Sequence, residues 1–288
     1  MDLCRSEPPP SGRLHNIKIL KEELFIKDSL VEHPRGVVLI THGIGSHSGR
    51  NEEWIQTLNR SGYSVFSYDL PGHGRSRKKK WLFNDFGVLT EALDSVCKMA
   101  MKYGGDREIP LFLFGHSMGG LITIDYVIRE QPAVDGVVLS APALDPGEMV
   151  RPWIITLAGS LRKIVPGLPI LKIPPSQLSR DPSVVQGYEN DPLVFQGKIK
   201  VVTGYEMLSR MQFVMKNAPD FQLPVLILQG GADTIVRPEV SLAFFNNLSA
   251  GDKTLRSYPD MYHELLKDIG KEEVMEDILE WIDARISD

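Results

Sequence analysis

Hydrophobic positions along the chain follow two periods that alternate from one segment to the next. Short continuous apolar runs, typical of strands buried on both faces of a sheet, are separated by segments with apolar residues every three or four positions, as in an amphipathic helix. This alternation predicts an α/β fold with a mostly parallel central sheet and helices on both faces. We expect strands at residues 24–26, 36–41, 63–69, 110–114, 134–140, 223–229 and 253–257, and helices at 52–60, 85–103 and 272–286, with a further helix that ends near residue 130.

One region interrupts the alternation. Residues 143–222 are rich in proline and glycine and contain short helical pieces but no convincing sheet strand. Such an insert is either a lid or a disordered loop, and its apolar content favours an ordered helical lid. The core is therefore expected at residues 17–142 and 223–288. The Pro- and Ser-rich residues 1–16 are expected to form a flexible tail.

Composition narrows the class of protein. The chain has 288 residues, 42% of them hydrophobic, and a formal net charge of −5. These values fit a globular protein and argue against a nucleic-acid binder, which usually carries a basic face. The two cysteines, Cys4 and Cys97, predict no structural disulfide, which favours a reducing compartment. Without an apolar signal segment or a run of about 18 apolar residues, we expect a cytoplasmic protein, at most peripheral to a membrane. The composition indicates no oligomeric state.

The pentapeptide Gly115-His-Ser-Met-Gly119 carries the clearest chemical signal. It follows the predicted strand 110–114 and precedes a predicted helix, which is the strand–turn–helix setting of the G-x-S-x-G nucleophile elbow. The turn is tight and strained, so bulky neighbours would clash there. A chance pentapeptide is the competing interpretation, but the strand before it and the helix after it favour the elbow. We therefore predict that Ser117 is a nucleophile.

A serine hydroxyl needs a nearby base, and after a nucleophile elbow the acid and then the histidine follow in the chain. His263 is the only histidine after Ser117 and is therefore the predicted base. Asp233 follows the predicted strand 223–229, and open α/β sheets build their sites at such carboxyl ends. Asp145 and Asp260 are the other candidate acids. We expect Asp145 to open the lid and Asp260 to shape a loop, which leaves Asp233 as the preferred acid.

A tetrahedral intermediate also needs hydrogen-bond donors for its oxyanion. Elbow enzymes supply the backbone N–H of the residue after the nucleophile, here Met118, and one from the loop after an earlier strand, here Ile44. No histidine spacing resembles a metal site, and this chemistry requires no metal or cofactor. The remaining histidines divide into those expected to support the loops (His42, His73, His116) and those expected at the surface or in loops (His15, His33, His47).

Several motifs together resemble one branch of the α/β-hydrolases, the monoacylglycerol lipases and lysophospholipases. They are T-H-G at 41–43, Y-D-L-P-G-H-G-R-S at 68–76, G-H-S-M-G at 115–119, Q-G-G-A-D at 229–233, L-S-R-D-P at 178–182 and Y-E-N-D-P-L at 188–193. The similarity extends from about residue 20 to the end of the chain. G-x-S-x-G occurs throughout the superfamily, whereas P-G-H-G-R-S and the lid motifs narrow the match.

The resemblance implies the α/β-hydrolase fold, a triad of Ser117, Asp233 and His263, and oxyanion donors at Ile44 and Met118. It also implies hydrolysis of fatty acyl esters, most specifically monoacylglycerol, and the apolar insert favours medium to long acyl chains. Ile44 is larger than the residue often found at this position in the family, so the cavity at the reacting carbonyl is expected to be narrow. The basic residues 75–80 are expected to form a solvated loop, with an anionic membrane or a phosphate-bearing ligand as the alternative.

The apolar side chains of the insert are the main clue to the substrate. Some must pack on the core, and the others are expected to contact an acyl or lipid substrate or a membrane surface. Two classes of alternative stay open: a lysophospholipase or broad carboxylesterase with the same triad, and a non-catalytic binder of acyl ligands. A peptidase of this fold is less favoured. The predicted substrate-binding residues are Trp153, Ile154, Leu157 and Leu161.

Overall fold

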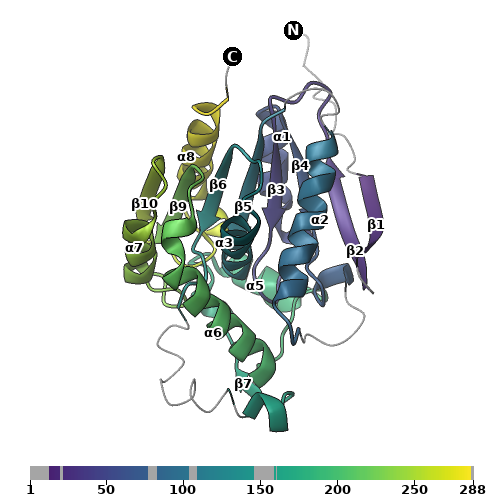
Figure 1. The fold of residues 1–288 in the computed structure, drawn as a ribbon, viewed down its shortest axis with the longest axis vertical. Helices are drawn as coiled ribbons and strands as arrows, with labels where there is room; N and C mark the ends of the chain where they lie inside the picture. The colour runs from purple at the N-terminus through teal and green to yellow at the C-terminus, as the bar shows by residue number, and fades with distance from the viewer. Residues whose placement is uncertain are drawn as a thin grey trace.

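The computed structural model describes residues 13–19, 22–76, 83–103, 109–145, 159 and 161–286. Within these ranges, eight strands form one sheet in the order β1-β2-β4-β3-β5-β6-β9-β10 (Figure 1). The pairs formed by β1 with β2 and by β2 with β4 are antiparallel, and the other pairs are parallel. The strands are β1 (Arg13–Ile19), β2 (Glu22–Ser29), β3 (Gly36–Thr41), β4 (Tyr63–Tyr68), β5 (Leu111–His116), β6 (Gly136–Ser140), β9 (Val225–Gly230) and β10 (Lys253–Tyr258).

Helices cover both faces of this sheet (Figure 1). Apolar side chains of α2, α3, α6 and α7 belong to one buried cluster, and those of α1 and α8 belong to the other. The helices are α1 (Glu52–Arg60), α2 (Gly87–Tyr103), α3 (Met118–Glu130), α5 (Pro182–Asn190), α6 (Val201–Lys216), α7 (Pro238–Asn247) and α8 (Lys271–Asp283).

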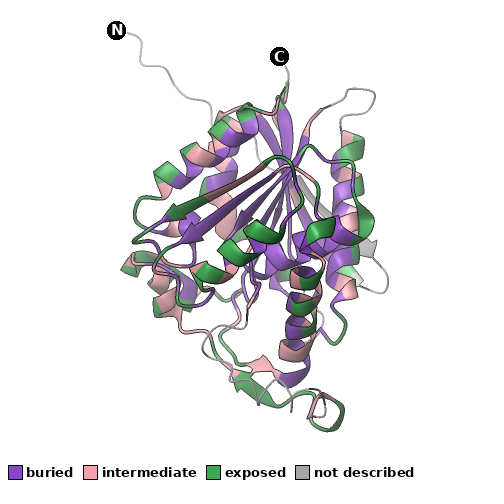
Figure 2. Ribbon diagram, turned by 60° about the vertical axis from the view of Figure 1, so that its left-hand side comes forward, coloured by how far each residue is buried: buried purple, intermediate pink, exposed green. Residues whose placement is uncertain are grey.

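Single strands show why the sheet is covered on both sides. In β3, Val37 and Leu39 belong to the first apolar cluster, whereas Val38 and Ile40 belong to the second. Successive side chains of a strand point to opposite faces, so a continuous apolar run requires apolar partners on both. The central strands are accordingly buried along their length, while the helices are exposed on their outer surfaces (Figure 2).

The predicted α/β fold with a mostly parallel sheet is confirmed. The predictions for residues 36–41 and 52–60 coincide with β3 and α1 at both ends. The amino end of the chain differs, because β1 begins at Arg13, inside the predicted flexible tail. Helix α7 was not predicted at all.

The insert 143–222 contains more regular structure than its sequence indicated. Helix α6 spans 16 residues, and β7 (Pro169–Leu171) pairs with β8 (Ile199–Lys200) in a short antiparallel sheet. The prediction of short helical pieces without a strand was therefore wrong for this part of the insert. The reason is that a two- or three-residue ladder leaves no period in the sequence. No helix among the described residues is long and apolar enough to cross a membrane.

Candidate active site

Ser117 lies at the sharp turn between β5 and α3, as predicted. Its backbone has φ 54° and ψ −120°, a combination that residues with a side chain rarely adopt. Hydrogen bonds hold it there: Ser117 N–H donates to the carbonyl of Ser140 at 3.0 Å, and the Ser117 carbonyl accepts from the N–H of Ala143, also at 3.0 Å. The strain is thus maintained by neighbouring backbone, as expected where a conformation serves a site.

The two glycines of the elbow are required by close backbone approach. A Cβ atom at Gly115 would lie 2.7 Å from the carbonyl oxygen of Gly119, and one at Gly119 would lie 2.2 Å from the carbonyl oxygen of Thr41. Both distances are shorter than any carbon–oxygen contact a folded chain tolerates. Gly119 therefore lets the end of β3 approach the first turn of α3, and Gly115 lets that turn lie against the end of β5.

Three side chains from distant parts of the chain meet at the carboxyl ends of the parallel strands. Nε2 of His263 lies 2.9 Å from Oγ of Ser117, and its Nδ1 lies 2.8 Å from Oδ2 of Asp233. All three residues are buried. Of the other candidate acids, Asp145 instead accepts from Arg237, and Asp260 is exposed.

The surroundings of Asp233 keep its carboxylate ionised. Burial disfavours the charge, but His263 and the backbone N–H groups of Ile235 and Val236 outweigh that effect, so the pKa of Asp233 lies below its ordinary value. These two N–H groups donate to Oδ1 at 2.8 and 3.0 Å. Oδ2 is thereby left facing the imidazole, which it orients.

The loops that carry Asp233 and His263 touch through backbone. Gly231 N–H donates to the carbonyl of Tyr258 at 2.8 Å, and Ala232 N–H donates to that of Met261 at 3.1 Å. A Cβ atom at Gly230 would lie 2.4 Å from the carbonyl oxygen of Met261. The glycines of Q-G-G-A-D therefore allow the approach that brings the acid to the base.

The loop after β3 is supported by His42, in the structural role expected for it. Nδ1 of His42 donates to the carbonyl of Gly43 at 2.8 Å, and Nε2 accepts from the N–H of Leu70 at 3.0 Å. Burial lowers the pKa of His42, His73 and His116 to about 3, so these rings are neutral near pH 7.

Asp69 has a structural role in the loop after β4. Asp69, in Y-D-L-P-G-H-G-R-S, accepts from the N–H and hydroxyl of Ser48 at 2.8 and 2.6 Å and from the N–H of Arg75 at 2.7 Å. A Cβ atom at Gly74 would lie 2.2 Å from Oδ2 of Asp69. This carboxylate therefore ties the loop after β4 to the one that carries Ile44.

A small cavity of about 20 Å³ lies over Ser117, with room for about one water molecule. Ile44, Leu178 and Tyr188 bound it on the side of the insert. Ile44 also borders two further small cavities, so it lines three small spaces. The cavity over Ser117 is small, and Ile44 is one of the residues that line it.

Residues that the sequence did not single out hold the base loop in place. Asp268 accepts from the N–H of Tyr262 at 2.7 Å and from the N–H of Arg180 at 2.8 Å, joining the loop of His263 to the insert. His47, expected as a surface or loop residue, lies in a loop but is buried, and its Nε2 lies 2.8 Å from Oδ2 of Asp191. Arg180 and Asp191 lie in the L-S-R-D-P and Y-E-N-D-P-L motifs, but a local motif does not reveal a partner that is far away in the chain.

Part of the predicted site lies outside the described residues, namely Trp153, Ile154 and Leu157, together with residues 77–80 of the basic run. Leu161 is described and half-buried in the insert. In the portion of the chain that the structure describes, no three His, Cys, Asp or Glu side chains are grouped to hold a metal ion.

A mostly parallel sheet with Ser, His and Asp meeting at its carboxyl edge defines the class of protein as an α/β-hydrolase. The family model described as serine aminopeptidase, S33, matches residues 32–270, and the chain belongs to this family.

Similar proteins fit this assignment. The chain is 30% identical to a monoacylglycerol lipase of Mycolicibacterium smegmatis, over 86% of this chain and 88% of the relative. It is 32% identical to a monoglyceride lipase of Rattus norvegicus, over 88% of this chain and 84% of the relative. The crystal structure of a monoacylglycerol lipase from Paleococcus ferrophilus superposes with a TM-score of 0.82 at 35% identity, covering 91% of this chain and 99% of that one.

Proposed function

We propose that the protein is a serine hydrolase that cleaves monoacylglycerol to glycerol and a medium- to long-chain fatty acid. The observation that carries the proposal is the continuous contact from Asp233 through His263 to a strained, buried Ser117. The relatives named monoacylglycerol or monoglyceride lipase support the choice of substrate. The reaction needs no metal or organic cofactor.

Acylation follows from the hydrogen-bond directions. Nδ1–H of His263 donates to Asp233, so Nε2 carries the lone pair that accepts the proton of the Ser117 hydroxyl. As that proton leaves, Oγ of Ser117 attacks the ester carbonyl carbon, and the carbonyl π electrons move to its oxygen. When the tetrahedral intermediate collapses, His263 returns the proton to the departing glycerol oxygen. Asp233 stays ionised and stabilises the imidazolium between these transfers.

The oxyanion is assigned to the backbone N–H groups of Met118 and Ile44. Met118 is the first residue of α3, and the first N–H groups of a helix have no partner inside it. Gly43 places the loop of Ile44 against the serine, since a Cβ atom there would lie 3.1 Å from Cβ of Ser117. Removal of one such donor typically costs about 3 kcal/mol of transition-state stabilisation.

Deacylation repeats the same transfers with water. His263 takes a proton from a water molecule, whose oxygen attacks the acyl carbon. Collapse of the second tetrahedral intermediate releases the fatty acid and restores the Ser117 hydroxyl with the proton held by His263. We assign the acyl chain to the apolar side chains of the insert, namely Trp153, Ile154, Leu157 and Leu161.

The proposal is tested by fluorophosphonate labelling and by hydrolysis of monoacylglycerol. Wild-type protein should be labelled and active, and Ser117→Ala should be neither. An unlabelled wild type would leave a non-catalytic acyl binder as the better interpretation. Parallel assays with lysophospholipid and with p-nitrophenyl esters of increasing chain length separate the alternative hydrolases. Activity confined to short acyl chains would contradict the lipase assignment.

Peripheral membrane contact through the insert is a second part of the proposal. Ile164, Val165, Leu168 and Ile170 are all exposed, Ile164 to 76%. Clustered exposed apolar residues of this kind mark surfaces that bind a membrane or a partner. Ile164→Ser combined with Leu168→Ser should reduce flotation with phosphatidylcholine vesicles, whereas Leu242→Ser, an exposed leucine of α7, should not. Equal flotation of all three proteins would remove this part of the proposal.

A further inference from the structure

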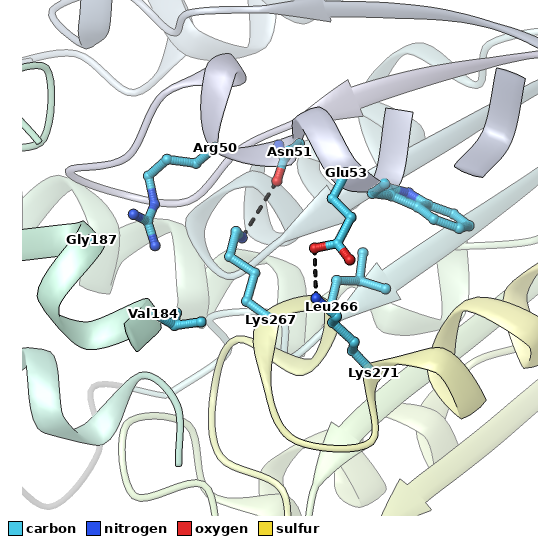
Figure 3. Close-up of a pocket in the computed structure, with 9 residues that line it drawn as sticks. Arg50, Asn51, Glu53, Val184, Gly187, Leu266, Lys267 and Lys271 are labelled. Atoms are coloured by element: carbon cyan, nitrogen blue, oxygen red, sulfur yellow. Dashed lines mark hydrogen bonds and ion pairs between the residues drawn. The ribbon is translucent and has the colours of Figure 1, made fainter. Parts of the chain in front are cut away.

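A second pocket, of about 180 Å³, lies among η1 (Ser48–Asn51), α1, α5 and the segment from η5 (Leu265–Lys267) to α8. Figure 3 shows the ends of Arg50 and Lys267 reaching into the same space, with Val184 and Gly187 of α5 on one side. Neither Ser117 nor His263 is among the described residues that line it. It is therefore a different space from the cavity over the serine.

The pocket carries more positive than negative charge. Arg50, Lys267 and Lys271 are its three cations. The carboxylates beside them are Glu264, which accepts from Arg50 at 2.9 Å, and Glu53, which accepts from Lys271 at 2.6 Å. Three cations thus share two carboxylates, which leaves an excess of one positive charge in and around the pocket.

Lys267 is the cation that lacks a carboxylate of its own. Its ammonium lies 3.7 Å from Oε2 of Glu264, the same oxygen that already accepts from Arg50. Its remaining polar contact among the described residues is a long one, 3.5 Å to the amide oxygen of Asn51 (Figure 3). The side chain is only 18% exposed. Burial accordingly lowers the pKa of Lys267, because Glu264 restores only part of the lost hydration.

Arg50 adds an unused donor. Its side chain is 9% exposed, one terminal nitrogen binds Glu264, and its guanidinium lies over the ring of Tyr188 at 4.8 Å. Nε of Arg50 is buried and has no hydrogen-bond partner in the described structure. A buried donor without a partner is costly, and native proteins usually satisfy it with a ligand or an ordered water.

A purely structural ion network would not leave these features together. Such a network matches its charges, because a buried charge without a partner destabilises the fold. Here one carboxylate serves two cations, one guanidinium N–H is unused, and the space between them is empty enough to hold a small ligand. Glu53, at 60% exposure, is held only by a pair that solvent screens, so Lys271 is available to another anion.

We propose that this pocket binds a phosphate-type oxyanion, held by Arg50, Lys267 and Lys271. A tetrahedral group with three or four acceptor oxygens matches a planar guanidinium N–H, two ammonium groups and the surplus charge. The group is either a free phosphate compound or the phosphate of a lipid head group. Both present the same chemistry to the pocket.

The first test is calorimetric titration of the full chain with inorganic phosphate, with ionic strength held constant by sodium chloride. Saturable binding is expected. Lys267→Gln should weaken it about tenfold, since a charge-assisted contact is lost. Lys271→Gln should weaken it several-fold and, with a side chain 25% exposed, carries little risk to folding. Circular dichroism confirms that each variant is folded.

Lys98→Gln is the matched control, since it removes the same charge from an exposed i,i+4 pair on α2. Its phosphate affinity should equal that of the wild type. Absence of saturable binding, or equal weakening by Lys98→Gln and Lys267→Gln, would overturn the proposal. Ser117→Ala should bind phosphate as the wild type does, so this result stands apart from the success or failure of the hydrolase assignment.

Two further experiments, the arms of this test, decide the source of the phosphate group. Displacement of phosphate by glycerol 3-phosphate, without flotation that depends on Lys267, assigns the site to a soluble phosphate compound. Flotation that increases when phosphatidic acid is added to phosphatidylcholine vesicles, and that Lys267→Gln abolishes, assigns it to a lipid head group. Failure of both arms would contradict a biological ligand of this chemistry.

Discussion

The two sides of His263 are built in different ways. Towards Ser117 and Asp233, backbone hydrogen bonds and glycine contacts fix each loop, and the polar atoms of the triad face one another. Towards the insert, the loop that follows the histidine is held by charged side chains, above all Asp268 and Glu264. One side is held mainly by backbone contacts. The other combines long-range ion pairs with bonds from backbone N–H groups to the Asp268 carboxylate.

This difference separates chemistry from selectivity. A triad tolerates little displacement, because a small misplacement of the reacting atoms costs much of the rate. Backbone contacts supply that rigidity at positions where only glycine fits. The side facing the insert depends on charged groups from separate segments, so it is the side on which substrate choice and additional binding can vary. The following substitutions test this division.

The largest effect is expected for Asp233→Asn. The amide oxygen can keep the bonds from Ile235 and Val236, which turns the amide N–H₂ towards His263. The imidazole must then accept at Nδ1 and carry its proton on Nε2, where it can no longer take the proton of Ser117. We expect kcat for monoacylglycerol to fall about 10⁴-fold, as the same change does in another serine triad.

Asp145→Asn serves as the control for Asp233→Asn, because Asp145 also follows a strand but pairs with Arg237 rather than with a residue of the triad. Its kcat should stay within about twofold of the wild type, in line with the small effect of most surface substitutions. A larger loss of kcat in Asp145→Asn than in Asp233→Asn would mean that the acid has been misassigned.

On the side facing the insert, the largest effect is expected for Asp268→Ala. The Asp268 side chain is fully buried and accepts from Tyr262, Arg180 and Ser179. Its removal leaves buried donors unpaired and should lower the free energy of unfolding by about 3 kcal/mol, measured by urea denaturation. Because Tyr262 precedes the base, kcat should fall too. Lys98→Ala, which breaks an exposed pair, should change stability by less than about 0.5 kcal/mol.

The same two sides of His263 differ in how well the sequence predicts them. The strand runs, the helix periods and G-x-S-x-G are local patterns, and they predicted β3, α1 and the position of Ser117. Order along the chain and strand-end position were enough to select His263 and Asp233. The fold and the meeting of these three side chains could therefore be predicted from the sequence.

The contacts on the side facing the insert could not be predicted from local patterns. Arg50 and Glu264 are 214 residues apart, and neither lies in a motif with a known spacing. Helix α7 begins at Pro238, and its N-cap residue, Arg237, makes no side-chain capping bond, so the start signal is weak; the helix also buries only a narrow face. Such features are set by packing between segments rather than by local pattern.

A smaller effect, on the rigid side, is expected in the pH dependence of stability. The pKa of His42 is about 3 in the folded protein and 6.5 for a free side chain, so between these values the unfolded chain binds a proton that the folded one does not. The free energy of unfolding should therefore fall as pH decreases from 6.5 towards 3, by about 1.4 kcal/mol per pH unit for one such histidine. His42→Gln should reduce that slope by this amount in urea titrations across pH, whereas the exposed His33→Gln should not. An unchanged slope in His42→Gln would contradict the neutral, buried assignment.

The smallest expected effect is at Ile44, where the two sides meet. Its backbone N–H belongs to the proposed oxyanion site, and the residue lines three small cavities. Ile44→Ala keeps the backbone N–H and removes most of the side chain beside these cavities. The kcat for a short linear ester should therefore stay within a few-fold of the wild type. Selectivity should change instead: kcat/KM for an ester branched beside the carbonyl should rise several-fold relative to the linear ester, consistent with the energy of one or two methylene groups.

Ile199→Ala provides the comparison that interprets this result. Ile199 borders the two cavities beyond Ile44 but not the one over Ser117. If the Ile44 side chain limits the space around the reacting carbonyl, Ile199→Ala should leave the ratio of kcat/KM for the branched ester to that for the linear ester unchanged. An equal rise in both variants would instead mean that the insert as a whole has loosened. Selectivity would then belong to the ion pairs that anchor the insert rather than to the single side chain beside the oxyanion site.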